Sequence, residues 1–283
     1  MKKYLKLIRI KHWIKNLLIF IPVMSAGVIT ATNLKLDILG FFAFSFASSF
    51  IYIINDIKDI EKDKQHPRKK LRPLASGQIT KNRAIIIAIL LLILSIITNL
   101  FITKSIFNLS LYFLLAYIII NISYSFGLKN IAIIDIILLA SGFILRVYYG
   151  ASILNIEVSK WLFLTIMSAS LFLGLGKRKK ELLTNKNTRN VLKEYNEEFL
   201  DKFQYLNLSM MFVFYSLWTL EQKNEYMYLT IPLLIIIFMK YSLIIEKSGE
   251  GDPTTILYQN KAFLLLCTVY ATIMILLLVV IQY

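Results

Sequence analysis

Cysteine and histidine, the usual ligands of zinc, are scarce in this sequence. Among 283 residues there is one cysteine, Cys267, and there are two histidines, His12 and His66, far apart in the chain. A single cysteine forms neither an intrachain disulfide nor a cysteine zinc site, and the two histidines show no metal-binding spacing. We interpret both histidines as side chains at a membrane interface.

Glycine, proline and charged residues are also few. The chain has 10 glycines and 5 prolines, 17% of its residues are charged, and 57% are apolar, with a mean hydropathy of +0.65. This composition is not that of a soluble domain of this length. It predicts a helical membrane protein.

Nine apolar segments follow a basic, amphipathic stretch at residues 1–16, which we expect to lie at the level of the lipid headgroups. Each segment is close to the ~20 residues that an α-helix needs to cross a bilayer. We therefore expect an all-α fold, in which residues 1–283 form one integral-membrane domain with about nine transmembrane helices. The segments are residues 17–32, 37–57, 84–103, 106–125, 131–153, 159–176, 204–222, 226–246 and 262–282.

Acidic residues are outnumbered by lysine and arginine, 17 to 32, which gives a formal net charge of +15. If the segments alternate in direction, 25 basic residues fall in loops on one side of the membrane and 4 on the other. Because basic loops stay in the cytoplasm, this distribution predicts a cytoplasmic N-terminus, an external C-terminus and long cytoplasmic loops at about residues 58–83 and 177–203. The net charge is thus a topological signal in the cytoplasmic (inner) membrane, and we expect no nucleic-acid partner.

The clearest polar motif lies where the second apolar segment meets the cytoplasm. Asp56, Asp59 and Asp63 follow Asn55 at positions i, i+3 and i+7, which share one face of a helix. Asp56 and Asp59 are one turn apart, so their carboxylates can converge on one ion, and carboxylate oxygens suit Mg²⁺. Three aspartates on one face would repel one another without a cation. The alternative interpretation is a solvated helix end, which the neighbouring lysines also fit.

The loop after this motif carries the cations that a diphosphate would need. Arg68 and Arg72 are four residues apart, and arginine offers bidentate donors to phosphate. The positive charge typical of cytoplasmic loops explains the adjacent Lys69 and Lys70 equally well. We therefore assign the two arginines to substrate binding and the two lysines to topology.

Two ionisable residues occur inside the fifth apolar segment. Asp135 and Arg146 share one helix face but lie ~16 Å apart along the axis, so they do not simply neutralise each other. Charges inside a membrane are costly and usually mark a polar cavity. For Arg146, a cavity role and snorkelling toward the far interface are both compatible with its position.

The sixth segment enters the cytoplasm at Gly176, Lys177 and Arg178. These two cations could meet phosphates, although a charge run after a span is also explained by topology. Tyr124 and Lys129, between the fourth and fifth segments, lie on the same side of the membrane. This side therefore collects the residues that could carry chemistry.

With these motifs the chain resembles the UbiA superfamily of intramembrane prenyltransferases, which has an N-D-x-x-D-x-x-x-D motif, nine spans and cytoplasmic active-site loops. Within it, the chain is most similar to the branch of decaprenyl-phosphate phosphoribosyltransferases. The shared motifs are W-x-K-N, H-P-x-K-x-x-R-P-x-A-x-G, Y-S-x-x-L-K with a later aspartate, F-x-x-R-x-x-x-G, and G-K-R. They lie here at residues 13–16, 66–77, 124–135, 143–150 and 176–178.

The resemblance covers residues 9–183 well and the remainder only in hydropathy. The second acidic motif of ordinary prenyltransferases, D-x-x-x-D, is reduced here to Asp135. This reduction argues against a second metal site of equal strength and against a plain prenyl-diphosphate donor.

The resemblance implies helices around a central cavity, phosphoribosyl pyrophosphate as donor and a polyprenyl phosphate as acceptor. It implies Mg²⁺ on Asp56 and Asp59, with Asp63 and Asp135 as further catalytic residues. A groove open to the lipid bilayer would hold the acceptor, and a homo-oligomer is compatible with this arrangement. The residues that it implies for substrate contact are Lys15, Asn55, Arg68, Arg72, Tyr124, Lys129, Arg146, Lys177 and Arg178.

Two other functions stay open at this point. An aromatic prenyltransferase would move an isoprenoid from its diphosphate onto a quinone precursor, and a second pair of aspartates would favour it. A lipid or small-molecule transporter would line a pathway with polar residues. Against the transporter, the charged residues gather on one side of the membrane.

Overall fold

The structure is a computed structural model, and it describes residues 2–65, 69–184, 190–247 and 253–280. All regular secondary structure in these ranges is helical, so the predicted all-α fold is confirmed. The chain divides into two compact units. Unit 1 is Met1–Phe20, Thr30–Ser125 and Leu145–Asn155, and unit 2 is Ile21–Ile29, Phe126–Ile144 and Ile156–Tyr283.

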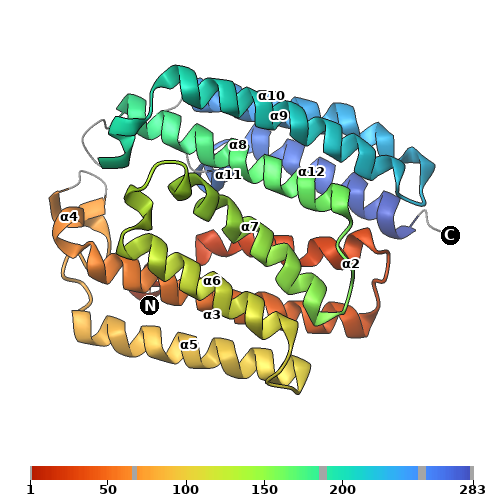
Figure 1. Cartoon of the computed structure of the whole chain (residues 1–283). Coiled ribbons are helices and arrows are strands. Elements are labelled where there is room, and N and C mark those ends of the chain that lie inside the picture. Colours follow the sequence, from red (N-terminus) through yellow and green to blue (C-terminus); the bar gives the residue numbers. More distant parts are fainter. Residues whose placement is uncertain (1, 66–68, 185–189, 248–252, 281–283) are drawn as a thin grey trace. The chain divides into compact units, whose positions relative to one another are not determined.

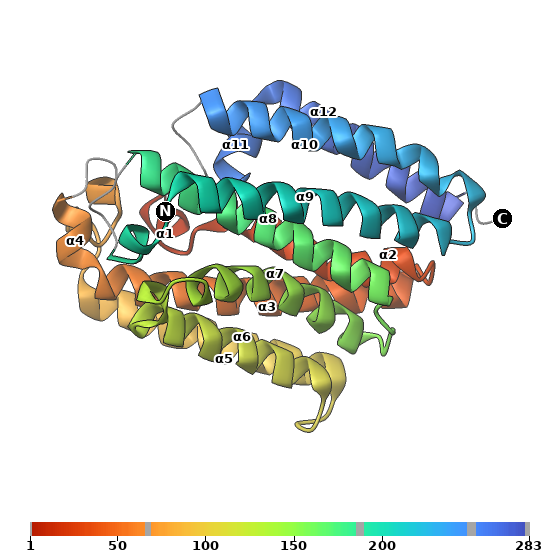
Figure 2. The ribbon, with the colours of Figure 1, turned by 45° about the horizontal axis from the view of Figure 1, so that its top comes forward.

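Unit 1 is built around helix α3, which ends in the acidic motif. Thr30 caps its N-terminus by accepting a hydrogen bond from the backbone N of Asn33 at 3.1 Å. Helices α5 and α6 run alongside α3 (Figure 1, Figure 2). The elements are α1 Lys2–Leu7, η1 Ile10–Phe20, α3 Ala31–Lys58, α4 Ile60–Gln65, η2 Lys69–Leu71, α5 Lys81–Thr103, α6 Leu109–Phe126 and the last part of α7 Ile134–Ile153.

Buried aromatic rings join these helices. The ring centroid of Phe44 in α3 lies 4.5 Å from that of Tyr117 in α6 and 5.2 Å from that of Tyr149 in α7. Between helices that cross a membrane, such contacts stabilise the fold by van der Waals packing, because lipid tails are as apolar as the side chains themselves. At Gly150, a Cβ would lie 2.0 Å from the backbone oxygen of Ile19, so only glycine lets α7 approach η1 this closely.

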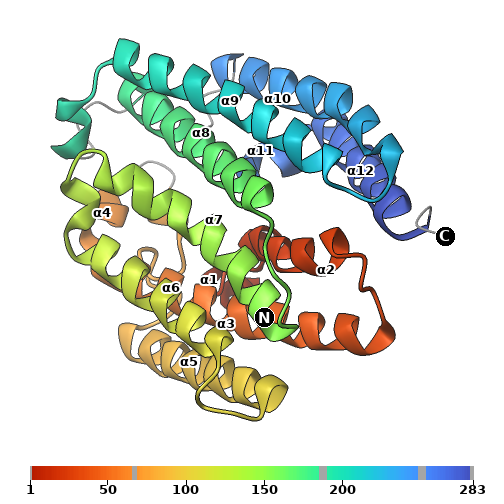
Figure 3. The same ribbon diagram turned by 45° about the vertical axis from the view of Figure 1, so that its right-hand side comes forward.

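Unit 2 contains α8 and α9, which lie side by side in every view, and α10 and α12, which pack on each other (Figure 1, Figure 3). Its apolar core includes Met211, Tyr215 and Trp218 of α9, all at most 4% exposed. The elements are α2 Ile21–Ser25, η3 Leu128–Asn130, the first part of α7, α8 Lys160–Thr184, η4 Asn190–Glu194, α9 Glu197–Leu220, η5 Glu225–Leu229, α10 Thr230–Lys247, α11 Pro253–Gln259, α12 Lys261–Ile275 and the π-helical turn η6 Leu276–Val280.

Six helical segments of the described chain are long and apolar enough to cross a membrane. Five are α3, α5, α6, α7 and the segment that begins with α12, and the sixth joins η5 to α10. Helices α8 and α9 are as long, but they are less apolar over a full crossing length. The membrane-protein class is thus supported, while the predicted number of nine spans is not confirmed.

The first expected span, residues 17–32, is divided in the structure. The 3₁₀-helix η1 ends at Phe20, and α2 covers only Ile21–Ser25. Pro22, in the first turn of α2, has no N–H, so a preceding helix cannot continue through it with all its hydrogen bonds. Gly27, with a φ of 66°, takes the left-handed conformation that stops α2. Two short helices therefore replace one long one.

Candidate active site

The acidic motif sits on a break between two helices. Helix α3 ends at Lys58, and its C-cap is Asp59, whose backbone N donates to the oxygen of Asn55 at 3.0 Å. Helix α4 then begins at Ile60 and carries Asp63. The sequence predicted one continuous helix face for the aspartates. In the structure Asp56 and Asp63 instead belong to two successive helices, and the two carboxylates share one hydrogen-bond partner.

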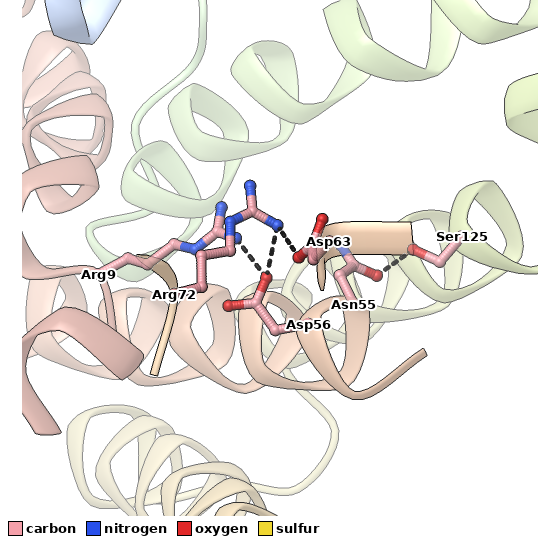
Figure 4. A network of polar contacts seen from close by, with 6 residues as sticks. All are labelled: Arg9, Asn55, Asp56, Asp63, Arg72 and Ser125. Carbon is pink, nitrogen blue, oxygen red and sulfur yellow. Dashed lines mark hydrogen bonds and ion pairs between the residues drawn. The ribbon is translucent and has the colours of Figure 1, made fainter. Parts of the chain in front are cut away.

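That shared partner is Arg72. Its Nη1 atom donates to Asp63 Oδ2 at 2.6 Å and to Asp56 Oδ1 at 3.1 Å, and the Arg9 guanidinium also forms an ion pair with Asp56 Oδ1 (Figure 4). Both aspartates are only 3% exposed, whereas the arginine side chains are 28% and 19% exposed. Two nearly buried carboxylates are thus balanced by two guanidinium groups.

Local structure holds Arg72 at this point. Its backbone N donates to the oxygen of Lys69 at 2.9 Å, and its own oxygen accepts from the backbone N of Ser76 at 2.9 Å. Leu74 and Ile79, farther along the loop, are buried in the core of unit 1. The loop predicted at residues 58–83 is therefore anchored by apolar contacts, which fix where Arg72 can reach.

Arg9 was not among the residues singled out from the sequence. It lies between α1 and η1, with a φ of 53°, and its guanidinium also stacks over the Tyr52 ring at 4.8 Å. In the sequence it is one of several cations of a basic lead-in, and topology accounts for all of them equally. No spacing rule connects it to Asp56, which lies 47 positions later.

Asn55 joins α3 to the end of α6. Its Oδ1 accepts a hydrogen bond from Ser125 Oγ (Figure 4), while Lys58 Nζ donates to the Ser125 backbone oxygen at 2.6 Å. These contacts position the last turn of α3, from which Asp56 projects. The expected contact between Asn55 and substrate stays a prediction.

Arg146 lies inside unit 1 and is 4% exposed. Its Nε donates to Asn16 Oδ1 at 2.8 Å, and its guanidinium carbon lies 5.1 Å from the Phe44 ring and 5.0 Å from the Tyr117 ring. This geometry favours the interior position over the alternative of snorkelling outward. Cation–π contacts in a desolvated setting are worth about 2 kcal/mol each, which offsets part of the cost of burying the charge.

In unit 2 the structure pairs Asp135 with Arg178. The Arg178 Nε donates to Asp135 Oδ2, both side chains are 0% exposed, and Arg178 Nη1 also meets Glu181 Oε2 at 2.5 Å. Tyr195, which the sequence did not indicate, donates its hydroxyl to Asp135 Oδ1 at 2.6 Å. Burial and this hydrogen bond raise the pKa of Tyr195, so the phenol stays a neutral donor.

The remaining sequence candidates are placed as follows. Lys15, Tyr124, Lys129 and Lys177 are half-buried, as is Asp59. Arg68 lies outside the described residues, so its predicted role is untouched. Within the described ranges there is no group of three or more histidine, cysteine, aspartate or glutamate side chains that could hold a metal ion.

The fold and the site together define a helical integral membrane protein with buried carboxylates and arginines at the end of a span. The family model of the UbiA prenyltransferase family matches residues 17–266 of the chain. The chain therefore belongs to the UbiA prenyltransferase family, and it is an enzyme, a transferase of that family.

Among its relatives, the decaprenyl-phosphate phosphoribosyltransferase of Mycolicibacterium smegmatis is 31% identical, over 93% of this chain and 88% of its own. The protein of the same name in Corynebacterium glutamicum is 30% identical, over 91% and 81%. A solved UbiA homolog from Archaeoglobus fulgidus, bound to GPP and Mg²⁺, superposes with a TM-score of 0.74 at 22% identity and covers 98% of this chain and 99% of that one. The resemblance inferred from the motifs is confirmed, and it reaches well beyond residues 9–183.

Proposed function

We propose that this protein transfers the 5-phosphoribosyl group of phosphoribosyl pyrophosphate to a polyprenyl phosphate and releases diphosphate. The observation that carries the proposal is the similarity, over about nine-tenths of the chain, to proteins named decaprenyl-phosphate phosphoribosyltransferase. The candidate active site adds independent support, because it combines acidic and basic groups of the kinds that a metal-bound diphosphate needs.

The donor set of the site fits Mg²⁺. Asp56 and Asp63 converge on a single nitrogen of Arg72, so their oxygens lie close to one point. Mg²⁺ typically takes one or two carboxylates from a protein and completes its shell with water and substrate phosphates. Asp56 and Asp63 would hold the ion, and Asp59, one turn from Asp56, stays a candidate ligand. When bound, Mg²⁺ would neutralise charge that develops on the leaving diphosphate.

The reaction needs little proton transfer. An oxygen of the polyprenyl phosphate attacks C1 of the ribose, the bond from C1 to the diphosphate oxygen breaks, and the diphosphate leaves with that electron pair. Because the attacking phosphate is already ionised near neutral pH, the main tasks are positioning and charge neutralisation. Arg9 and Arg72, which contact the same carboxylates, would donate hydrogen bonds to the donor's diphosphate.

The location of the site follows the charge distribution. We infer that the C-terminal end of α3 lies on the cytoplasmic side of the inner membrane, because most basic residues fall in loops on the same side as this end. A donor that is a soluble phosphorylated sugar would then reach the site directly. The lipid acceptor would enter from the bilayer with its phosphate at the interface.

The test uses purified protein in detergent with Mg²⁺, a polyprenyl phosphate and phosphoribosyl pyrophosphate labelled in the ribose, followed by extraction into organic solvent. We expect label in the organic phase, lost with EDTA and in Asp56→Asn. Lys62→Gln is the matched control, because it changes the charge of an exposed side chain in the same motif. Transfer from a prenyl diphosphate to an aromatic acceptor, without ribose transfer, would contradict the proposal.

A further inference from the structure

The two carboxylates that would hold a metal already have cationic partners in the chain itself. Asp56 Oδ1 is contacted by both Arg9 and Arg72, and Asp63 Oδ2 is contacted by Arg72. The four side chains carry two negative and two positive charges, so the cluster is neutral. A divalent cation that bound to these carboxylates alone would leave two uncompensated positive charges beside two aspartates that are 3% exposed.

A diphosphate changes this balance. Its negative charge compensates the two positive charges that would be in excess when the divalent cation is bound. Planar guanidinium groups also bind phosphate oxygens in bidentate fashion. Phosphate oxygens would also replace water in the octahedral shell of the metal, so the metal would gain charged ligands that two carboxylates and water do not supply. Metal and diphosphate should therefore bind together much better than the metal binds alone.

The placement of the arginines allows such an exchange. Asp56 belongs to the long helix α3 and is almost fully buried, so it has little freedom to move. Arg9 lies in the turn between α1 and η1, and Arg72 follows η2, and their side chains are 19% and 28% exposed. The cations can therefore turn from carboxylate to phosphate while the aspartates stay in place.

We propose that Arg9 and Arg72 are internal counter-ions of the acidic pair, and that they make tight divalent-cation binding at Asp56 and Asp63 conditional on the donor's diphosphate. This inference rests on the proposed function, since it assigns the metal to the same aspartates. It adds a coupling between metal binding and diphosphate binding at that site, and a role for Arg9. The competing explanation is that the two arginines only fasten α4 and the basic lead-in to α3.

The test measures metal binding, not activity. Equilibrium dialysis of the purified full-length protein in detergent with radioactive Mn²⁺, which prefers the same oxygen ligands, gives its affinity with and without inorganic diphosphate at equal free Mn²⁺. For the wild-type protein we expect diphosphate to raise the affinity at least about tenfold. For Arg72→Gln we expect the affinity without diphosphate to rise by about tenfold, since a charge-assisted contact no longer competes, and the effect of diphosphate to shrink.

Two further variants separate the explanations. Arg9→Gln should change the affinity in the same direction but less, because of the two aspartates Arg9 is seen to contact only Asp56, whereas Arg72 contacts both. Lys62→Gln removes an exposed charge from the acidic motif and should change nothing. If the arginines only fasten the helices, Arg72→Gln loosens the carboxylates and lowers Mn²⁺ affinity in both conditions. That result, or equal wild-type affinities with and without diphosphate, would overturn the proposal.

The outcome also distinguishes this inference from the proposed function. If Asp56→Asn abolishes Mn²⁺ binding while the arginine variants leave the diphosphate-free affinity unchanged, the counter-ion role is wrong and the metal site stands. If the wild-type protein binds no Mn²⁺ even with diphosphate, the metal assignment fails and the counter-ion role fails with it. Ribose transfer to lipid is measured separately and does not depend on the dialysis result.

Discussion

The ion pair of Asp135 and Arg178 in unit 2 gives a stability prediction that the structure makes specific. Both side chains are 0% exposed, so Asp135→Asn would remove a buried acidic partner of Arg178, whose contact with Glu181, itself 23% exposed, would remain. Removing one partner of a buried pair typically costs about 3–5 kcal/mol. Because Glu181 remains at 2.5 Å, and an asparagine oxygen can still accept from Tyr195, we expect a loss of about 3 kcal/mol.

Thermal unfolding in detergent, followed by tryptophan fluorescence, measures this loss. At roughly 2 °C per kcal/mol for a chain of this size, the midpoint should fall by about 6 °C. The matched control is Asp201→Asn. It breaks the ion pair between Lys179, which lies next to Arg178 on α8, and Asp201 of α9. Those side chains are 18% and 26% exposed, so the loss should stay below about 1 kcal/mol.

The double variant Asp135→Asn with Arg178→Gln completes the test. Because the buried Arg178 charge is removed as well, the double variant should cost clearly less than the sum of the two single costs, with a coupling of about 1–3 kcal/mol. An Asp135→Asn protein that unfolds at the wild-type temperature but no longer transfers ribose would refute this reasoning. Asp135 would then act on substrate, as the family resemblance alone suggested.

Three other substitutions test separate parts of the structure. Gly150→Ala should lower the unfolding temperature although alanine favours helices, because its Cβ would lie 2.0 Å from the backbone oxygen of Ile19. The control Gly174→Ala should leave the unfolding temperature nearly unchanged, because the nearest neighbour of its Cβ is a side-chain methyl at 3.3 Å. Asp37→Asn should unfold at the wild-type temperature or above it, since Asp37 is 0% exposed and neither carboxylate oxygen has a hydrogen-bond partner among the described residues. A clearly lower unfolding temperature would show that the carboxylate holds a partner. Asp63→Asn removes a proposed metal ligand and should reduce ribose transfer by at least about tenfold, since the loss of an outer-shell partner alone typically costs about tenfold to a hundredfold. An unchanged rate would remove Asp63 from the site.

Most of the helices could be predicted from apolar length alone. The expected segments at 84–103 and 131–153 correspond to α5 Lys81–Thr103 and α7 Ile134–Ile153, because a run of that length has no other stable form in lipid. The segment at 17–32 failed because hydropathy does not register what Pro22 does to a helix. At the ends of helices, side-chain caps and isolated glycines decide the boundary, and these shift it by a few residues.

The candidate site was predictable only in part. The acidic residues share a short motif, and Arg72 follows in the same loop, so local spacing pointed to both. The helix break at Asp59 was not visible, because nothing in the spacing of the aspartates distinguishes one helix from two. Arg9 and Tyr195 lie 47 and 60 positions from the aspartates that they contact, and such pairings depend on the fold rather than on any local pattern.

The most direct test of the proposed reaction follows each part of the donor separately. Phosphoribosyl pyrophosphate labelled with tritium in the ribose and with radioactive phosphorus at the β-phosphate would be incubated with a polyprenyl phosphate, Mg²⁺ and the purified protein. Transfer of the 5-phosphoribosyl group predicts tritium in the organic phase, with all the phosphorus label in the aqueous phase as diphosphate. Both labels in the lipid, or neither with the protein folded and metal present, would contradict the account.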